Sequence, residues 1–264
     1  MSYLNGYGLN KLTDTFDRIL DTLERVKELR RKHAHDIPKR AKEAHQEVLD
    51  KINQFIPGDN IERKVLCSHF IPGSGCLVEL EDGKSHILLN YDIASFDSSN
   101  GTYQAFKESN PEKKVTPKDF LMNVVAHEYG HILFEERIES KLRQNLFYSL
   151  KSLHFSIPSE FDEAFAFSFA DNVTEFKSPL NGFAFTYERN GLDFDKTIQA
   201  YNDLNQLLKN EGTDAIFNHG NIREILSKYF KQDSKVFEEK NISGPIIDGL
   251  KESYFNQYFS ERKH

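Results

Sequence analysis

The sequence predicts an α+β protein, in which a small mixed sheet and a mostly helical C-terminal part follow two N-terminal helices. Apolar residues recur in steps of three and four over residues 9–55, which is the spacing of amphipathic helices. Between residues 65 and 90 the apolar stretches become short and are bounded by Gly, Pro and Asp, as strands usually are. Helical spacing returns at residue 117. We therefore divide the chain into residues 1–57 and residues 58–264.

The N-terminal unit, residues 1–57, is predicted to be an antiparallel helical hairpin. The apolar stripe of its first helix consists of Leu9, Leu12, Phe16, Ile19, Leu23 and Val26. Asp36-Ile37-Pro38 interrupts the pattern. The stripe of the second helix consists of Ile37, Ala41, Ala44, Val48, Ile52 and Phe55. We expect the hairpin to serve as scaffolding or as the interface of a homodimer, with a lid or inhibitory pro-segment as the alternative.

The second unit, residues 58–264, is predicted to hold the strands and one long helix up to about residue 145. Strands are expected at residues 65–70, 76–80 and 85–90, and a loop rich in Ser, Asn and Gly at about 95–116. Thr116 and Pro117 are typical of a helix N-cap and first turn. The expected helices span residues 117–137, 160–171, 195–209, 221–231 and 246–259.

The charge balance argues against a nucleic-acid partner, because 41 acidic residues face 34 basic ones and the net charge is −7. No apolar stretch reaches the length of a membrane-spanning helix. The first residues also lack the basic start and apolar segment of a secretory signal. We therefore expect a cytoplasmic protein without a membrane partner.

Two cysteines, Cys67 and Cys76, fall on predicted strands. In a cytoplasmic protein they are expected to be reduced thiols. A local disulfide is one alternative. A second metal site formed with His69 is another, although the spacing of these three residues matches no standard zinc pattern.

The strongest functional signal is the pentapeptide His127-Glu128-Tyr129-Gly130-His131. Two histidines four residues apart on a helix share one face, separated by a rise of roughly 6 Å. Both rings can therefore reach one metal ion, and Glu128 between them can polarise a water molecule on that ion. This H-E-x-x-H pattern is typical of zinc-dependent hydrolases, most often peptidases.

The surroundings of the pentapeptide argue against a chance match. By composition alone, such a match would arise about once in 50 to 100 chains of this length. Here, however, residues 120–134 are apolar on nearly every side apart from Asn123 and the motif itself. A helix that is buried all round has no reason to carry two histidines and a glutamate unless they are paired or bind a metal.

A catalytic zinc site needs a third protein ligand, which the motif helix does not supply. The metzincin pattern would place Gly and His at positions 134 and 137, but these hold Phe134 and Arg137. A glutamate on a later helix is the alternative. Glu160 and Glu163 are both candidates on the helix predicted at 160–171.

The chain resembles the gluzincin, or glutamate-zincin, group of metallopeptidases. Many members carry the third ligand in a helix reading roughly N/D-E-G/A-F-A, and this chain has Asp162-Glu163-Ala164-Phe165-Ala166. The resemblance covers roughly residues 65–175 and implies a zincin-like domain with Glu163 as the third ligand. Two features depart from the family. The segment between His131 and Glu163 is long, and the Asp of the thermolysin-like pattern would fall at position 167, which holds Phe.

The predicted function is hydrolysis of peptide bonds in a peptide or protein substrate, with one Zn²⁺ per chain held by His127, His131 and Glu163. Glu128 is the expected general base. A donor to the oxyanion is expected among Tyr187, His154, Tyr201 and His219. An edge strand at 76–80 or 85–90 could bind the substrate by strand addition.

The alternatives to a zinc peptidase are a non-catalytic zinc-binding scaffold or partner-binding protein with a peptidase fold, and an enzyme that hydrolyses a non-peptide amide.

Overall fold

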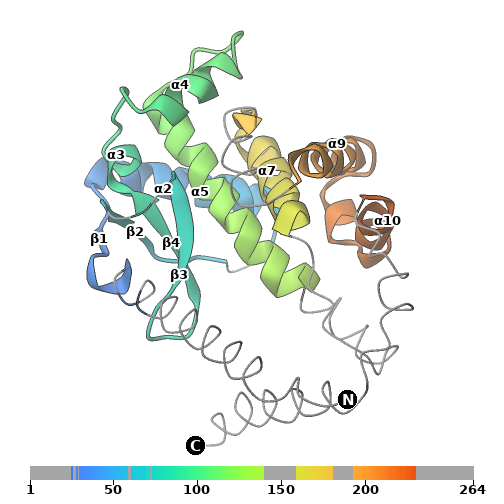
Figure 1. The fold of residues 1–264 in the computed structure, drawn as a ribbon, viewed down its shortest axis with the longest axis horizontal. Helices are drawn as coiled ribbons and strands as arrows, with labels where there is room; N and C mark the ends of the chain where they lie inside the picture. The colour runs from blue at the N-terminus through green and yellow to red at the C-terminus, as the bar shows by residue number, and fades with distance from the viewer. Residues whose placement is uncertain are drawn as a thin grey trace, which may run out of the picture.

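A computed structural model describes residues 25, 28, 30–58, 61–69, 71, 73–139, 159–180 and 193–229. Within them the protein is α+β, as predicted. The long helix α5, Pro117–Leu133, lies between a four-stranded sheet on one side and helix α7, Ser159–Thr174, on the other (Figure 1). The centre of the molecule is therefore the pair of helices that carries the H-E-x-x-H motif and the candidate third ligand.

The sheet is mixed, with the strand order β1-β2-β4-β3. β2 (Val65–Ser68) pairs parallel with β4 (Ser85–Asn90), and β4 pairs antiparallel with β3 (Gly75–Glu79). The three predicted strands are thus confirmed within two residues. β1 (His35–Asp36) was not predicted, and it pairs antiparallel with β2. Among the described strands, β3 forms one edge of the sheet and β4 is internal.

Helix α2, Lys39–Phe55, confirms the second helix of the predicted hairpin. Its apolar stripe is buried from Ala41 to Ile52 and belongs to the same hydrophobic core as α5 and α7. The helix is therefore built into the described core. Most of the first predicted helix lies outside the described residues, and so does the expected helix at 246–259.

The prediction of a loop over residues 95–116 was wrong in its central part, where α4 spans Gly101–Glu108. Asn100 caps this helix, because its side-chain oxygen accepts hydrogen bonds from the backbone N–H groups of Thr102 and Tyr103. Tyr103 and Phe106, three residues apart, bury their rings. The Ser, Asn and Gly content that suggested a loop in fact marks the start of a helix. A short helix α3, Tyr91–Ala94, precedes α4.

Helix α5 begins at a capping box, as Thr116 and Pro117 predicted. The Thr116 side chain accepts a hydrogen bond from the backbone N–H of Asp119, whose carboxylate accepts one from the backbone N–H of Thr116. The helix is buried on most sides, from Phe120 to Leu133. It continues into a π-helical segment, Phe134–Glu139.

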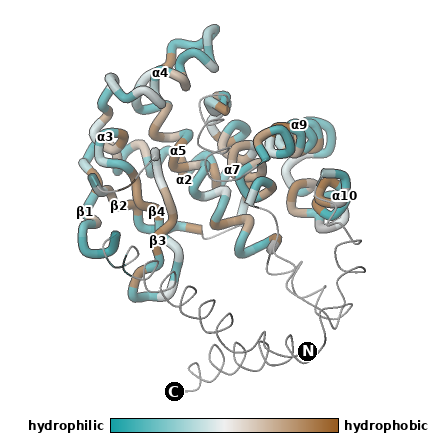
Figure 2. The backbone as a smooth tube through the Cα atoms, in the orientation of Figure 1, coloured by the Kyte–Doolittle hydropathy of each residue, from teal (hydrophilic) through white to brown (hydrophobic). Residues whose placement is uncertain are grey.

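The C-terminal described part packs on the side of α7 away from the sheet (Figure 1). It consists of α9 (Phe194–Glu211), a 3₁₀ turn at Thr213–Phe217, and α10 (His219–Tyr229). Both predicted helices in this region are confirmed. Figure 2 shows hydrophobic residues on β2 and β4 and hydrophilic residues over most of α4, in keeping with their burial and exposure.

A buried polar cluster ties α7 to its neighbours. The Asp171 carboxylate accepts hydrogen bonds from the Ser178 backbone N–H, from the Ser178 hydroxyl and from the Tyr201 hydroxyl of α9. Asn123 of α5 donates to Thr174 of α7. Burial raises the pKa of Asp171 to about 6, against the effect of these hydrogen bonds. The cluster fixes the relative rotation of three helices because each hydrogen bond is directional.

The closest approach between α5 and α7 is at Gly130. A Cβ atom built on Gly130 would lie 2.6 Å from the Cα of Ala166, which is closer than real Cβ contacts allow. The glycine of the motif and the small Ala166 therefore let the two backbones lie almost in contact. Any side chain at position 130 would separate the helices.

We expect Gly130→Ala to destabilise the protein. The added methyl group meets backbone, so no rotamer change can relieve the clash, and overpacking of this kind costs about 1–3 kcal/mol. A contact with backbone lies at the upper end of this range, and the better helix propensity of alanine returns about 1 kcal/mol, which leaves a net loss of about 2 kcal/mol. Chemical denaturation of both forms measures the difference.

The matched control is Gly101→Ala in α4, where an added Cβ has nothing within 4 Å. This variant should unfold at the same denaturant concentration as the wild type or slightly above it. Equal stability of Gly130→Ala and the wild type would contradict the packing described here.

Candidate metal centre

His127, His131 and Glu163 form a cluster of potential metal ligands, whose ligand atoms all lie within 4.8 Å of one another. The Nε2 atoms of the two histidines are 3.1 Å apart. The carboxylate oxygens of Glu163 lie 3.5 Å from Nε2 of His127 and 3.8 Å from Nε2 of His131. The structure thus brings together the three residues that the sequence singled out, from α5 and α7.

These separations fit a tetrahedral metal ion. Ligand atoms bound at 2.0–2.1 Å to such an ion lie about 3.3–3.4 Å from one another. The observed 3.1, 3.5 and 3.8 Å lie near this value, where the distance to His127 is from Oε2 of Glu163 and the distance to His131 is from Oε1. The three side chains are 14–29% exposed, so an ion at this position would also be open to a solvent or substrate ligand. Two imidazoles and one carboxylate with an open position is a donor set typical of catalytic zinc sites.

Glu160, the rival third ligand, has a different partner. Its Oε1 atom accepts a hydrogen bond from the backbone N–H of Asp193, at 3.2 Å, at the start of α9. Glu160 lies one turn before Glu163 on α7, so the helix spacing alone does not separate the two. The metal-ligand cluster contains Glu163 and not Glu160.

Asp162 supports His131 at Nδ1, the ring nitrogen that faces away from the ligand cluster. Nδ1 of His131 donates to Oδ1 of Asp162 at 2.8 Å. Burial by itself would lower the pKa of His131, but the carboxylates of Asp162 and Glu163 outweigh it and raise the pKa to about 10. The same negative charges favour a metal cation beside the ring. Sequence reasoning missed this role of Asp162, which entered only as the residue before Glu163 in the helix pattern. An acid next to the candidate ligand was the signal that could have found it.

His127 lacks the support that His131 has. Its Nδ1 atom is buried and, within the described part of the chain, has no hydrogen-bond partner. The ring of Phe167, one turn after Glu163 on α7, lies with its centroid 4.4 Å from that of His127. The two histidines of the cluster are thus held in different ways, one by a carboxylate and the other by an aromatic ring.

Glu128 is buried, with 5% exposure, and lies against the edge strand β3. A Cβ atom built on Gly75, the first residue of β3, would lie 2.8 Å from Oε1 of Glu128. The carboxyl therefore occupies the space that a side chain at position 75 would take. Burial raises the pKa of Glu128 above its ordinary value, although the two histidines act in the opposite direction. A raised pKa suits a group that must take up a proton and release it again.

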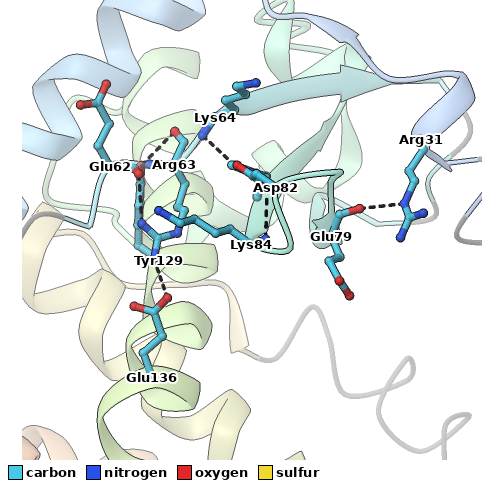
Figure 3. A network of polar contacts seen from close by, with 10 residues as sticks. Arg31, Glu62, Arg63, Lys64, Glu79, Asp82, Lys84, Tyr129 and Glu136 are labelled. Atoms are coloured by element: carbon cyan, nitrogen blue, oxygen red, sulfur yellow. Dashed lines mark hydrogen bonds and ion pairs between the residues drawn. The ribbon is translucent and has the colours of Figure 1, made fainter. Parts of the chain in front are cut away.

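Tyr129, between the motif histidines, faces away from the cluster and anchors the chain before β2. Its hydroxyl accepts a hydrogen bond from the backbone N–H of Arg63 (Figure 3). The same hydroxyl lies 2.9 Å from Nε2 of His45 on α2. The buried guanidinium of Arg63 forms an ion pair with Glu136, just after α5 (Figure 3). The motif helix is therefore fixed at the face opposite the candidate ligands.

The structure leaves the oxyanion donor open. The Tyr201 hydroxyl donates to Asp171 in the buried polar cluster. His154 and Tyr187 lie outside the described residues, and the side chain of His219 is not described. The two cysteines are free thiols on β2 and β3, which β4 separates. Over the described ranges, Cys67, His69 and Cys76 do not form a metal-ligand cluster.

Among the described residues, no helix combines the length and apolar character needed to cross a membrane. Comparisons of the chain with protein-family models, with curated proteins and with solved structures found no match.

We expect Glu163→Gln to lower the affinity of the protein for zinc by about 100-fold or more, because the variant replaces a charged ligand with a poor neutral one. Glu160→Gln is the matched control on the same helix. Its amide oxygen can still accept the hydrogen bond from Asp193, so zinc affinity should stay at the wild-type value. Competition with a chromophoric chelator measures both. A larger loss in Glu160→Gln than in Glu163→Gln would reverse the assignment.

Proposed function

We propose that the protein is a zinc-dependent peptidase of the gluzincin type. One observation carries the proposal: His127, His131 and Glu163 converge at separations that fit a tetrahedral ion, and the buried Glu128 lies on the same helix between the two histidines. Structural zinc sites are closed by four protein ligands, whereas this cluster offers three among the described residues. The arrangement therefore favours catalysis over a purely structural role.

A zinc ion held by these residues would supply a Lewis acid and lower the pKa of water toward neutrality. Residues of the chain supply the proton transfer and hold the ligands in orientation. Glu128 takes a proton from the attacking water and returns it to the leaving nitrogen of the scissile bond. Its burial against Gly75 keeps the carboxyl in one place and raises its pKa, which suits both transfers. Asp162 holds the ring of His131 in orientation through Nδ1.

The edge strand β3 supports a peptide as the substrate. Within the described sheet, β3 pairs with β4 on one side, so its other edge offers backbone N–H and C=O groups, apart from the Glu79 carbonyl, which accepts a hydrogen bond from Arg31 (Figure 3). Its first residue, Gly75, touches Glu128. An extended peptide added to this edge would therefore run past the general base, as strand addition requires. A small amide without an extended backbone would gain nothing from this edge.

A non-catalytic zinc-binding scaffold is the alternative. Binding of the metal does not require Glu128, because the three ligands are complete without it. Burying a carboxyl that has no structural task costs free energy. The presence of Glu128 in this buried position therefore favours the enzyme, and measured turnover separates the two functions.

We expect Glu128→Gln to abolish most peptide cleavage and to leave zinc binding intact. The variant keeps the size of the side chain but removes the proton acceptor, a change that typically costs about 10²–10⁴-fold in rate. A peptide library read by mass spectrometry measures cleavage, and elemental analysis measures bound zinc. Zinc binding without cleavage in the wild type would favour the scaffold, and no binding of supplied zinc would exclude both functions.

We also expect Gly75→Ala to lower cleavage without loss of zinc or of stability. The added methyl group meets the flexible end of the Glu128 side chain, so the carboxyl moves while the fold does not. The double variant Gly75→Ala/Glu128→Gln serves as the control. Because the methyl group acts through Glu128, the double variant should be no less active than Glu128→Gln alone. Fully additive losses would show that Gly75 acts by another route.

A further inference from the structure

The two candidate metal-binding histidines differ at the nitrogen that faces away from the ligand cluster. On His131 this atom, Nδ1, donates to Asp162 at 2.8 Å. On His127 the corresponding Nδ1 is buried and has no hydrogen-bond partner among the residues that the structure describes. The ring of Phe167 packs against His127, with centroids 4.4 Å apart and an angle of 46° between the ring planes.

This difference has a consequence once an ion is bound. A histidine that binds a metal through Nε2 must carry its proton on Nδ1. On His131 that proton has an acceptor. On His127 the N–H group is buried without one, which costs free energy in the metal-bound form. An acceptor would also make the ring a stronger ligand, because a shared Nδ1 proton leaves more electron density on Nε2.

Phe167 is the residue of α7 whose ring packs against that of His127. It lies four residues after Glu163 on α7, so both side chains leave the helix on the same face. The residue one turn before it supplies a ligand, and Phe167 itself covers the ring of His127. A shorter side chain that carries an oxygen at this position would bring a hydrogen-bond acceptor next to the ring of His127.

We propose that Phe167 is a positioning residue that holds the metal affinity of the centre down by packing an apolar ring, in place of a hydrogen-bond acceptor, against His127. The inference rests on the proposed metal centre. It makes the bound ion exchangeable, so that occupancy of the centre follows the supply of free metal. Outer partners of ligating histidines typically change metal affinity by about 10–100-fold, which sets the size of the expected effect.

The test compares three substitutions at one position in the full chain. Phe167→Asp adds a charged acceptor, Phe167→Asn adds a neutral acceptor, and Phe167→Leu removes the aromatic ring without adding one. Zinc affinity of the metal-free proteins is measured by competition with a chelator. We expect Phe167→Asp to bind zinc about tenfold more tightly or better. Phe167→Asn should gain less, because it lacks the charge, and Phe167→Leu should stay at the wild-type affinity.

A second readout separates a hydrogen bond from a general effect on packing. In the zinc-loaded protein, ¹⁵N NMR reports the proton on Nδ1 of His127. In the Asn and Asp variants this proton should shift downfield and exchange more slowly with water, while the proton on Nδ1 of His131 should not change. Thermal unfolding of the metal-free proteins identifies variants that have lost the fold. Phe167→Asn is the milder change if Phe167→Asp does not fold.

Three outcomes would overturn the inference. One is an unchanged or lower zinc affinity in folded Phe167→Asn and Phe167→Asp. Another is an equal gain in Phe167→Leu, which would assign the effect to removal of the ring alone. Absence of zinc binding in the wild type would remove both this inference and the metal centre. Failure of the proposed peptidase function looks different, because zinc would then bind with the expected order of affinities and no peptide would be cleaved.

Discussion

The near-contact of α5 and α7 at Gly130 and Ala166 is the constraint on which the rest of the structure depends. Two helices pack this closely only where small residues face each other, because interaxial distance is set by the side chains at the contact. The short distance allows Glu163 on one helix to reach within 3.8 Å of both histidines on the other. Larger residues at positions 130 and 166 would leave the same three side chains too far apart to share an ion.

The close packing of α5 and α7 is held in place from several sides. The sheet, α2 and the Tyr129 hydroxyl fix the outer face of α5, and the cluster around Asp171 joins α7 to α9. Buried polar groups of this kind are costly unless every one of them has a partner. The buried Nδ1 of His127 lacks a hydrogen-bond partner among the described residues, and it belongs to the candidate metal centre and not to these anchoring contacts. The anchoring contacts and the candidate ligands thus involve different residues of the same two helices.

Sequence patterns were sufficient for the local structure. Thr116, Pro117 and Asp119 mark the start of α5, because capping depends on residues three positions apart. The strands and the stripe of α2 follow from the alternation and spacing of apolar residues. The prediction was wrong where the same residue types are common both in loops and at the start of helices. A loop was expected at Asn100, but its side chain caps the start of α4. The two-residue strand β1 has no pattern of its own, because its pairing with β2 alone defines it.

For the candidate site, the sequence by itself determined that His127, Glu128 and His131 share one helix face, since a spacing of four residues fixes that geometry. It left Glu160 and Glu163 as rivals, because both lie on one helix and only the packing of that helix decides which side chain faces α5. The tertiary structure turned Glu160 toward Asp193 and Glu163 toward the histidines. It also decided the roles of Asp162, Phe167 and Gly75, whose contacts join segments far apart in the chain and leave no periodic signal in the sequence.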